Sequence, residues 1–173
     1  MLGNFSKKAV LHEDEDAIER TLELKKDEKI KIKQFHKNDP ENSVHFDSLE
    51  ELLIDISKND FHCREADIKI IFSGNNEFPY SAREQWTDSC NLLAIKEGVV
   101  LGYDRNDKTA EAFKAAGFQV IHAKELIPQI VSGKINTQQI TDTLILMPSA
   151  ELSRARGGFH CMSMPLLRET VNE

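Results

Sequence analysis

The chain has 173 residues, of which 40% are hydrophobic and 29% charged, and its formal net charge is -7 at pH 7. This length and composition fit one globular domain with a sizeable core. The acidic balance argues against a nucleic-acid partner, because phosphate binding needs a basic face. No segment has the apolar length of a membrane span, and the first residues lack the apolar core of a signal peptide, so we expect a cytoplasmic protein with no membrane partner.

The first part of the chain predicts a strand, a helix and a second strand. Hydrophobic and charged residues alternate over 29–33, which is typical of a strand with one solvent-facing side. Ser48 and Glu51 form a Ser-x-x-Glu capping box before apolar residues at helical spacing, which predicts a helix over 49–56. The short apolar run over 67–72 predicts the strand that closes this unit.

After a turn-rich segment, strands alternate with helices. The pattern predicts a hairpin that joins 91–95 to 98–103, and then a helix over 107–116 that ends at Gly117. A short helix and a surface excursion are expected within 124–141. Further strands are predicted over residues 118–123, 143–147 and 159–164. The sequence therefore indicates an α/β fold.

The cysteines predict neither a disulfide framework nor a zinc site. Cys63, Cys90 and Cys161 are an odd number without C-x-x-C spacing. We therefore expect no metal and no cofactor.

Cys161 follows a segment that is rich in glycine and arginine. Gly157 and Gly158 allow the backbone to turn or to approach a ligand closely, and the charges of Arg154 and Arg156 would favour a thiolate. This pattern is typical of a cysteine nucleophile. The alternative is that Cys161 is a small buried hydrophobe at the start of a core strand, as most free cysteines are.

Four ordered segments resemble the arginine deiminases, which belong to the guanidine-modifying (amidinotransferase-like) superfamily. They cover residues 83–88, 91–95, 98–106 and 152–167. Residues 1–66 carry no motif of comparable strength. The resemblance implies an N-terminal module over 1–66, which is weakly matched, and an arginine deiminase-like module over 67–173, which carries the nucleophile loop.

The resemblance also implies a chemistry, that of a hydrolase in arginine catabolism. In arginine deiminases a cysteine thiolate attacks the guanidinium carbon of L-arginine, ammonia leaves, and water hydrolyses the thiouronium intermediate to citrulline. By motif position Cys161 matches the nucleophile. Arg156 matches an arginine on the mobile loop that orders the substrate-bound site, and Gly157 and Gly158 belong to the same loop.

The family fold is an α/β-propeller of five β-β-α-β modules, of which this chain is expected to hold about two. In the family, a His-x-Asp strand and the guanidinium-binding carboxylates lie upstream of the matched region. His45 and Asp47 form a His-x-Asp pair, but the capping box places Asp47 at a helix entry. His160 is expected to be structural, because neighbours on a strand point to opposite faces and His160 could not readily serve Cys161 as a base.

The sole tryptophan, Trp86, is expected to have a scaffold role. Its ring would be buried while Arg83 and Glu84 pair locally. The motif pattern assigns no substrate contact to Asp88 or Asn91.

Two functions remain open for the chain. One is a hydrolase acting on L-arginine or a related guanidinium compound, with a companion chain supplying the missing carboxylates and histidine. The other is a catalytically inactive truncated or split-gene product that serves as an assembly or small-molecule binding module. Without a credible His-x-Asp strand, we expect the isolated chain to be inactive. A cut propeller exposes strand edges, so a homo-oligomer or an upstream half-chain is the expected partner.

Overall fold

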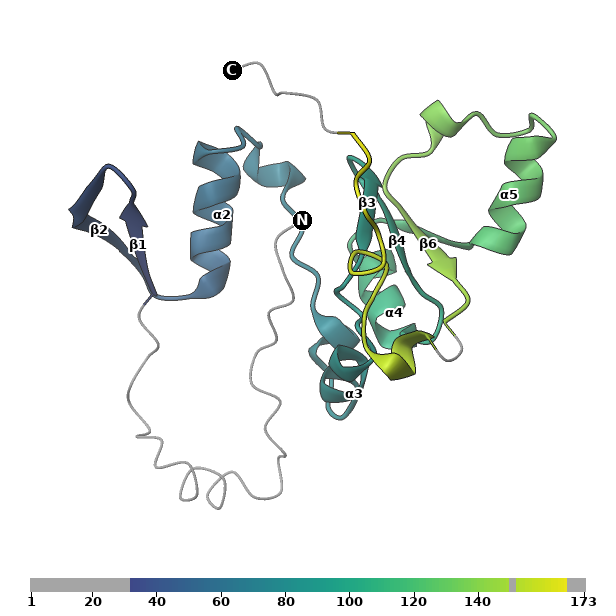
Figure 1. Cartoon of the computed structure of the whole chain (residues 1–173), viewed down its shortest axis with the longest axis horizontal. Helices are drawn as coiled ribbons and strands as arrows, with labels where there is room; N and C mark the ends of the chain where they lie inside the picture. The colour runs from purple at the N-terminus through teal and green to yellow at the C-terminus, as the bar shows by residue number, and fades with distance from the viewer. Residues whose placement is uncertain (1–31, 150–151, 168–173) are drawn as a thin grey trace. The chain divides into compact units, whose positions relative to one another are not determined.

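The computed structural model describes residues 32–149 and 152–167, which divide into two compact units at Ile70 and Ile71 (Figure 1). These residues contain two β-sheets and four α-helices. The expected α/β class is therefore confirmed. The number of propeller modules stays a prediction.

The first unit is a β-hairpin followed by one helix. β1 (Ile32–His36) and β2 (Asp39–Phe46) pair in antiparallel fashion, and α2 (Leu49–Asn59) follows. Of the strand expected over 29–33, residues 29–31 lie outside the described part, and the remaining two belong to β1. No side chain that the structure describes in this unit is fully buried.

The predicted capping box sets the start of α2. The Ser48 hydroxyl accepts a hydrogen bond from the Glu51 N–H at 3.2 Å, and the Glu51 carboxylate accepts one from the Asp47 N–H at 3.0 Å. Both bonds satisfy donors at or next to the helix start that have no partner within the helix. Asp47 is a helix-entry residue, as expected.

The strand predicted over 67–72 is wrong. Glu65–Asp67 is a short 3-10 helix, and residues 68–72 are irregular. The Asp67 N–H donates to the Arg64 carbonyl at 2.9 Å and the Ile68 N–H to the Glu65 carbonyl at 3.2 Å. These local bonds satisfy the backbone at the start of the run, and none of the described strands pairs with it.

The second unit is built on a four-stranded sheet in the order β3-β4-β6-β5. β3 and β4 form the predicted antiparallel hairpin, whereas β4, β6 and β5 run parallel to one another. The strands predicted over 118–123 and 143–147 are also confirmed, although the first ends one residue early because a helix begins at Ala123. The strands are β3 (Leu93–Lys96), β4 (Val99–Tyr103), β5 (Gln119–His122) and β6 (Thr143–Met147).

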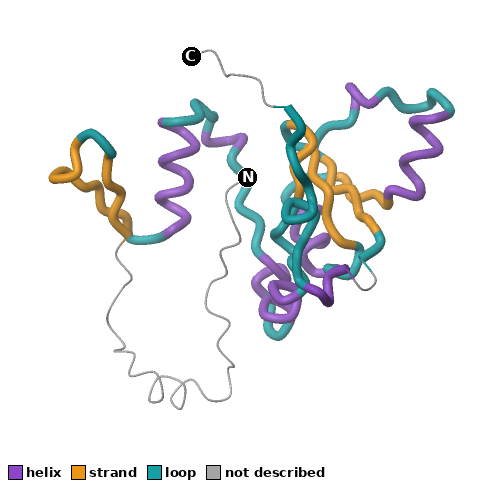
Figure 2. The backbone as a smooth tube through the Cα atoms, in the orientation of Figure 1, coloured by secondary structure: helices purple, strands orange, loops and turns teal. Residues whose placement is uncertain are grey.

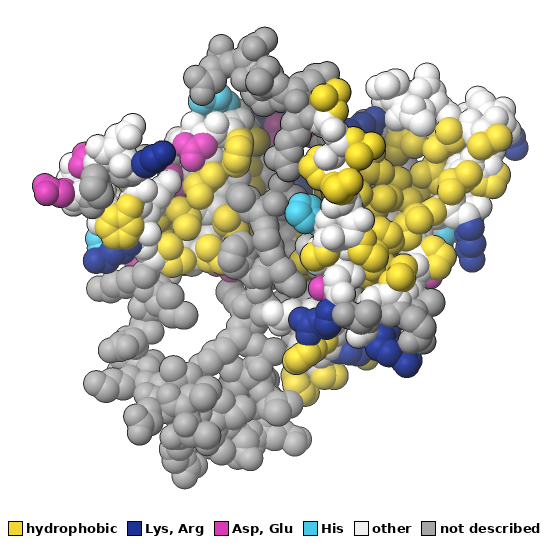
Figure 3. Space-filling view, in the orientation of Figure 1, with side chains coloured by type: hydrophobic (Ala, Val, Ile, Leu, Met, Phe, Trp, Pro, Cys, Tyr) yellow, Lys and Arg dark blue, Asp and Glu magenta, His cyan; other side chains and the backbone are white. Residues whose placement is uncertain are grey.

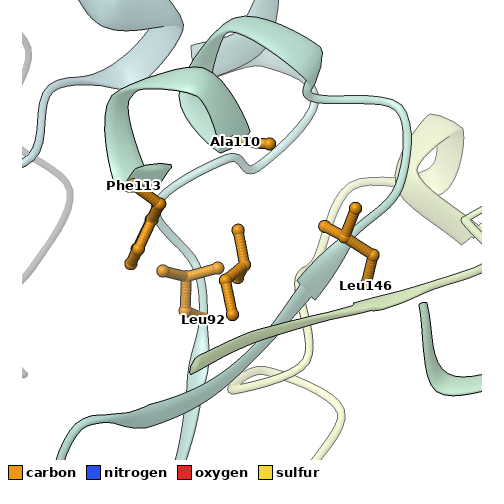
Figure 4. Close-up of a cluster of buried hydrophobic side chains, with 5 residues drawn as sticks. Leu92, Ala110, Phe113 and Leu146 are labelled. Carbon is orange, nitrogen blue, oxygen red and sulfur yellow. The ribbon is translucent and has the colours of Figure 1, made fainter. Parts of the chain in front are cut away.

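Two helices cover opposite faces of this sheet. α4 (Asp107–Ala115) is the predicted helix before Gly117, and α5 (Ala123–Val131) is the short helix expected after β5. Alternate residues of the central strand β6 contribute to both faces, because side chains alternate along a strand. The cluster on the α4 side is Leu92, Ala110, Phe113, Leu144 and Leu146 (Figure 4), and the cluster on the α5 side is Val99, Ala123, Leu126 and Ile145. Each fully buried Leu, Ile, Val or Phe contributes about 1.5–3 kcal/mol to stability.

A short helix, α3 (Tyr80–Trp86), anchors the start of α4 through Glu84. The Glu84 carboxylate is fully buried and accepts hydrogen bonds from the Lys108 N–H (3.0 Å), the Thr109 N–H (2.8 Å) and the Thr109 hydroxyl (2.8 Å). The two N–H groups belong to the first turn of α4 and have no partner within the helix, and the negative charge suits the helix N-terminus. Arg83 also contacts Glu84 at 3.0 Å, so the expected local pair is confirmed.

The strand predicted over 159–164 is wrong, and the chain after β6 is mostly loop (Figure 2). The Met162 N–H donates to the Gly158 carbonyl and the Ser163 N–H to the His160 carbonyl, both at 3.2 Å. These turn bonds occupy backbone groups that a strand would use for pairing. Met162 and Met164 are consequently exposed rather than part of the core.

Candidate active site

The carboxyl ends of the three parallel strands meet at one edge of the sheet. β4 ends there at Tyr103 and β6 at Met147. Because β3 runs antiparallel to β4, the start of β3 lies at the same edge, with Leu93 paired to Leu101 and Asn91 two residues earlier. Open α/β sheets bind ligands outside the carboxyl ends of their parallel strands.

Cys161 is exposed at this edge, and its sulfur has a defined partner. The Asn91 side-chain nitrogen donates to the Cys161 sulfur at 2.8 Å. This hydrogen bond ties Cys161 to the segment just before β3. The interpretation of Cys161 as a buried residue of a core strand is therefore wrong.

Gly157 is held by hydrogen bonds at both its N–H and its carbonyl. Its N–H donates to the Asp88 carboxylate at 3.0 Å, and its carbonyl accepts from the Tyr103 hydroxyl at 2.9 Å. Gly157 has φ +117°, a conformation that favours glycine, and a Cβ placed there would lie 3.7 Å from the Cys161 Cβ. These bonds fix the backbone immediately beside the cysteine.

Gly158 packs directly on Asn91. A Cβ at this position would lie 2.2 Å from the Asn91 carbonyl oxygen and 2.6 Å from the Asn91 Cβ, so no other residue fits without movement. The residue that contacts the sulfur therefore also contacts the glycine loop. The sequence predicted a turn or a close approach to a ligand here, and the close approach that the structure shows is to Asn91 of the same chain.

Arg156 stacks on Trp86. Its guanidinium carbon lies 4.5 Å from the centre of the indole ring, within the range of a cation–π interaction. Trp86 is 67% exposed, so the expectation that its ring is buried is wrong. The partner of the ring comes from a distant part of the sequence, which local patterning does not reveal.

Tyr103 is a neutral hydrogen-bond donor below this loop. Burial raises the pKa of the Tyr103 phenol. The nearby Asp88 and Cys161 raise this pKa further, because negative charge on them opposes ionisation of the phenol. The ring also packs against Phe159, with centroids 4.6 Å apart. Tyr103 thus keeps its proton and its bond to the loop through the neutral pH range.

Two further contacts tie the segment after β6 to the end of β4. Asp104 accepts from the N–H and the hydroxyl of Ser149, at 3.1 Å and 3.0 Å, and Arg105 donates to the Ser153 hydroxyl at 2.7 Å. Asn106 precedes α4, but its side chain bonds to Thr87 instead of capping the helix.

The histidines considered from the sequence have other partners. A ring nitrogen of His45 lies 3.4 Å from the Ser43 hydroxyl within the first unit. His160 lies in a turn, so the argument that strand geometry keeps it from serving Cys161 as a base no longer applies. The carbonyl of His160 accepts hydrogen bonds from the N–H and the hydroxyl of Ser163.

Asn91, Asp88 and Tyr103 are site residues that sequence reasoning did not assign. They lie 70, 69 and 54 residues from the groups they contact. Their position within the recognised motifs was the one available signal.

Within the described ranges, no group of three or more His, Cys, Asp or Glu side chains is placed to hold a metal ion. None of the helices found there is both long and apolar enough to cross a membrane.

Comparison with known proteins identifies the family. The arginine deiminase family model matches residues 9–168. Arginine deiminase from Oenococcus oeni is 34% identical over 144 residues, which are 83% of this chain and 28% of the relative. Those from Borrelia garinii and Listeria monocytogenes are both 38% identical, over 104 and 107 residues, which are 60% and 62% of this chain and 20% of each relative. The chain therefore spans between a fifth and under a third of the curated relatives it matches, and it belongs to the arginine deiminase family.

Proposed function

We propose that this chain carries the nucleophile-bearing part of an arginine deiminase, which hydrolyses the guanidinium group of L-arginine or a related compound. The observation that carries the proposal is the exposed Cys161 sulfur 2.8 Å from the Asn91 amide, at the carboxyl edge of the parallel strands. Family membership supplies the reaction class.

In the proposed reaction the Cys161 thiolate adds to the guanidinium carbon and forms a C–S bond. A C–N bond then breaks, and the nitrogen leaves as ammonia after it takes up a proton. Water adds to the resulting thiouronium carbon and the C–S bond breaks. This step regenerates the Cys161 thiolate and releases the ureido product, citrulline. The Asn91 N–H stabilises negative charge on the sulfur at the start and at the end of this cycle.

The proposed role of Arg156, Gly157 and Gly158 is to shape the approach to the sulfur. Gly158 brings the backbone into close contact with Asn91, and Gly157 adopts a φ of +117° that favours glycine. Arg156 adds a positive charge to the same segment. A larger residue at Gly158 would collide with Asn91, and one at Gly157 would be strained by the φ of +117°.

The reaction needs more than these groups. A guanidinium is a planar cation that is oriented by paired carboxylates, and departure of ammonia requires a general acid. We propose that a companion or upstream chain supplies them, that 1–66 and 67–173 are two modules of the family's propeller, and that the isolated chain is inactive.

An assembly role is the second candidate, and two observations favour it. No side chain described in residues 32–70 is fully buried, and Figure 3 shows apolar side chains gathered over the second unit on the side of α5. Exposed apolar surface of this kind favours association. We propose a homo-oligomer on this ground.

A complementation assay tests the proposed enzyme. The chain would be mixed with the part of the Oenococcus oeni relative that it does not cover, and citrulline would be measured with L-arginine as substrate. We expect no citrulline from the chain alone, citrulline from the mixture, and none when Cys161→Ala is used. Citrulline from the chain alone that Cys161→Ala abolishes would contradict the proposed dependence on a companion.

A labelling pair tests the site without turnover. An alkylating amidine carries the planar cation of a guanidinium, and the matching alkylating amide is neutral. If Cys161 serves guanidinium chemistry, the complemented protein should favour the amidine over the amide at Cys161 more strongly than at the exposed Cys63. Equal preference at both cysteines would argue against the proposed substrate class.

A further inference from the structure

The only tryptophan of the chain presents one face to a charge from the nucleophile loop. Trp86 is 67% exposed at the end of α3, and the Arg156 guanidinium lies 4.5 Å from its ring centre. The contact therefore places a cation over the face of an exposed aromatic ring, the arrangement of a cation–π interaction.

The backbone at Arg156 and Gly157 has an unusual conformation. Arg156 has φ +66° and Gly157 φ +117°, so two consecutive residues lie in the left-handed region. A non-glycine residue adopts this conformation only at a cost, which other contacts have to offset. The stacking on Trp86 is one such contact, and the bonds of Gly157 to Asp88 and Tyr103 are two more.

The strength of the stacking decides what it can do. At an exposed site a cation–π contact shifts an equilibrium by about two- to fivefold. This factor is too small to retain a free guanidinium ligand from solution. It is sufficient to bias a side chain that is already tethered beside the ring, because no association entropy is lost.

We propose that Trp86 is a positioning residue for the nucleophile loop. Its ring docks Arg156, and through Arg156 it favours the backbone conformation in which Gly157 is bonded to Asp88 and Tyr103 and lies beside Cys161. The contact is weak enough to release when the loop moves. The bearing of this docking on catalysis rests on the proposed role of Cys161, whereas its test does not.

Fluorescence gives the first test, because all indole emission of the chain comes from Trp86. Arg156→Gln removes the charge above the ring, and Arg156→Lys keeps a cation there. We expect a changed emission maximum or intensity for Arg156→Gln, and emission closer to the parent chain for Arg156→Lys. Identical emission from the parent and Arg156→Gln would overturn the proposal.

Limited trypsin digestion gives the second test. Cleavage after Arg156 needs the loop to leave its docked conformation, so its rate follows the undocked population. Trp86→Leu keeps an apolar side chain without a π face and should speed this cleavage by about two- to fivefold, whereas Trp86→Phe keeps a π face and should remain near the parent rate. Cleavage after Lys37, in the turn between β1 and β2, is the internal control and should not change.

Parent-like protection of the Arg156 site in Trp86→Leu, or equal acceleration in Trp86→Leu and Trp86→Phe, would overturn the proposal. If Trp86→Leu unfolds the second unit, as shown by circular dichroism, the fluorescence comparison decides, since Arg156→Gln leaves the indole ring in place. Neither test measures turnover. Loss of the proposed citrulline activity and loss of the docking contact are therefore separate results.

Discussion

The Asn91 side-chain nitrogen lies 2.8 Å from the Cys161 sulfur, across 70 residues of sequence. The two residues meet because β3 runs antiparallel to β4, which brings its start to the carboxyl edge of the sheet. Gly158 then packs on the Asn91 backbone. The placement of the sulfur is thus determined within this chain, whatever else the complete site requires.

We expect Cys161 to be alkylated faster than the other two cysteines. Cys161 and Cys63 are exposed, but Cys161 has the Asn91 amide beside its sulfur, and burial raises the pKa of the Cys90 thiol. A raised pKa means that the Cys90 thiolate forms only at higher pH. Cys90 should therefore be alkylated most slowly, and its alkylation rate should rise only at a higher pH than the rates of the other two cysteines. Mass spectrometry after brief iodoacetamide treatment at several pH values ranks the three. Labelling at Cys161 no faster than at Cys63 would show that the loop does not activate it.

Changes at Asn91 should act on Cys161 alone. Asn91→Ala removes the donor to the sulfur and should slow alkylation of Cys161 by roughly three- to tenfold at neutral pH, which is the scale of the net contribution of one ordinary hydrogen bond. Asn91→Asp places a like charge beside a thiolate and should slow it further. The rate at Cys63 serves as the reference in each variant. Equal rates in the parent and both variants would show that the contact does not influence the sulfur.

Loss of the Glu84 carboxylate should destabilise the second unit strongly. Glu84→Ala leaves one buried and one partly buried N–H group at the start of α4 without their acceptor and is expected to cost about 2–4 kcal/mol. Glu111→Ala on the same helix removes a carboxylate whose side chain is 54% exposed and should cost less than about 1 kcal/mol. Urea unfolding followed by circular dichroism compares them. Similar midpoints for the two variants would refute the anchoring role.

We expect the isolated chain to self-associate at micromolar concentration. None of the side chains described in residues 32–70 is fully buried, and several large apolar residues are exposed, such as Val131, which is 82% exposed. Exposed apolar surface of this kind favours association. Light scattering coupled to size exclusion measures the mass directly. A monomer near the chain mass of 19.7 kDa that unfolds cooperatively would contradict this expectation.

Elements with strong local signals were predictable from the sequence. The capping box at Ser48, the hairpin from β3 to β4 and the helix before Gly117 each follow from residues close together in the chain, and all three are confirmed. β6 was predictable for a related reason. A continuous apolar run is typical of a strand that is buried on both faces, and its first four residues are buried.

The wrong predictions share a physical cause. The runs over 67–72 and 159–164 are rich in apolar residues, but apolar composition does not provide the neighbouring strand that a strand needs. In both segments local turn hydrogen bonds satisfy part of the backbone instead. The buried position predicted for Trp86 failed because its partner, Arg156, is remote in sequence. Motif resemblance located the Cys161 loop, but the roles of Asn91, Asp88 and Tyr103 required the three-dimensional structure.

Helix α3 contacts both the start of α4 and the loop beside Cys161. Glu84 reaches inward to the start of α4, and Trp86, two residues later, reaches outward to Arg156. The smallest piece of this chain that could preserve the cysteine in its present surroundings therefore has to include α3 as well as the sheet. Trimming from the N-terminus through Ile70 would leave that set of contacts intact, whereas trimming through Trp86 would keep the thiol and discard the groups that shape its loop.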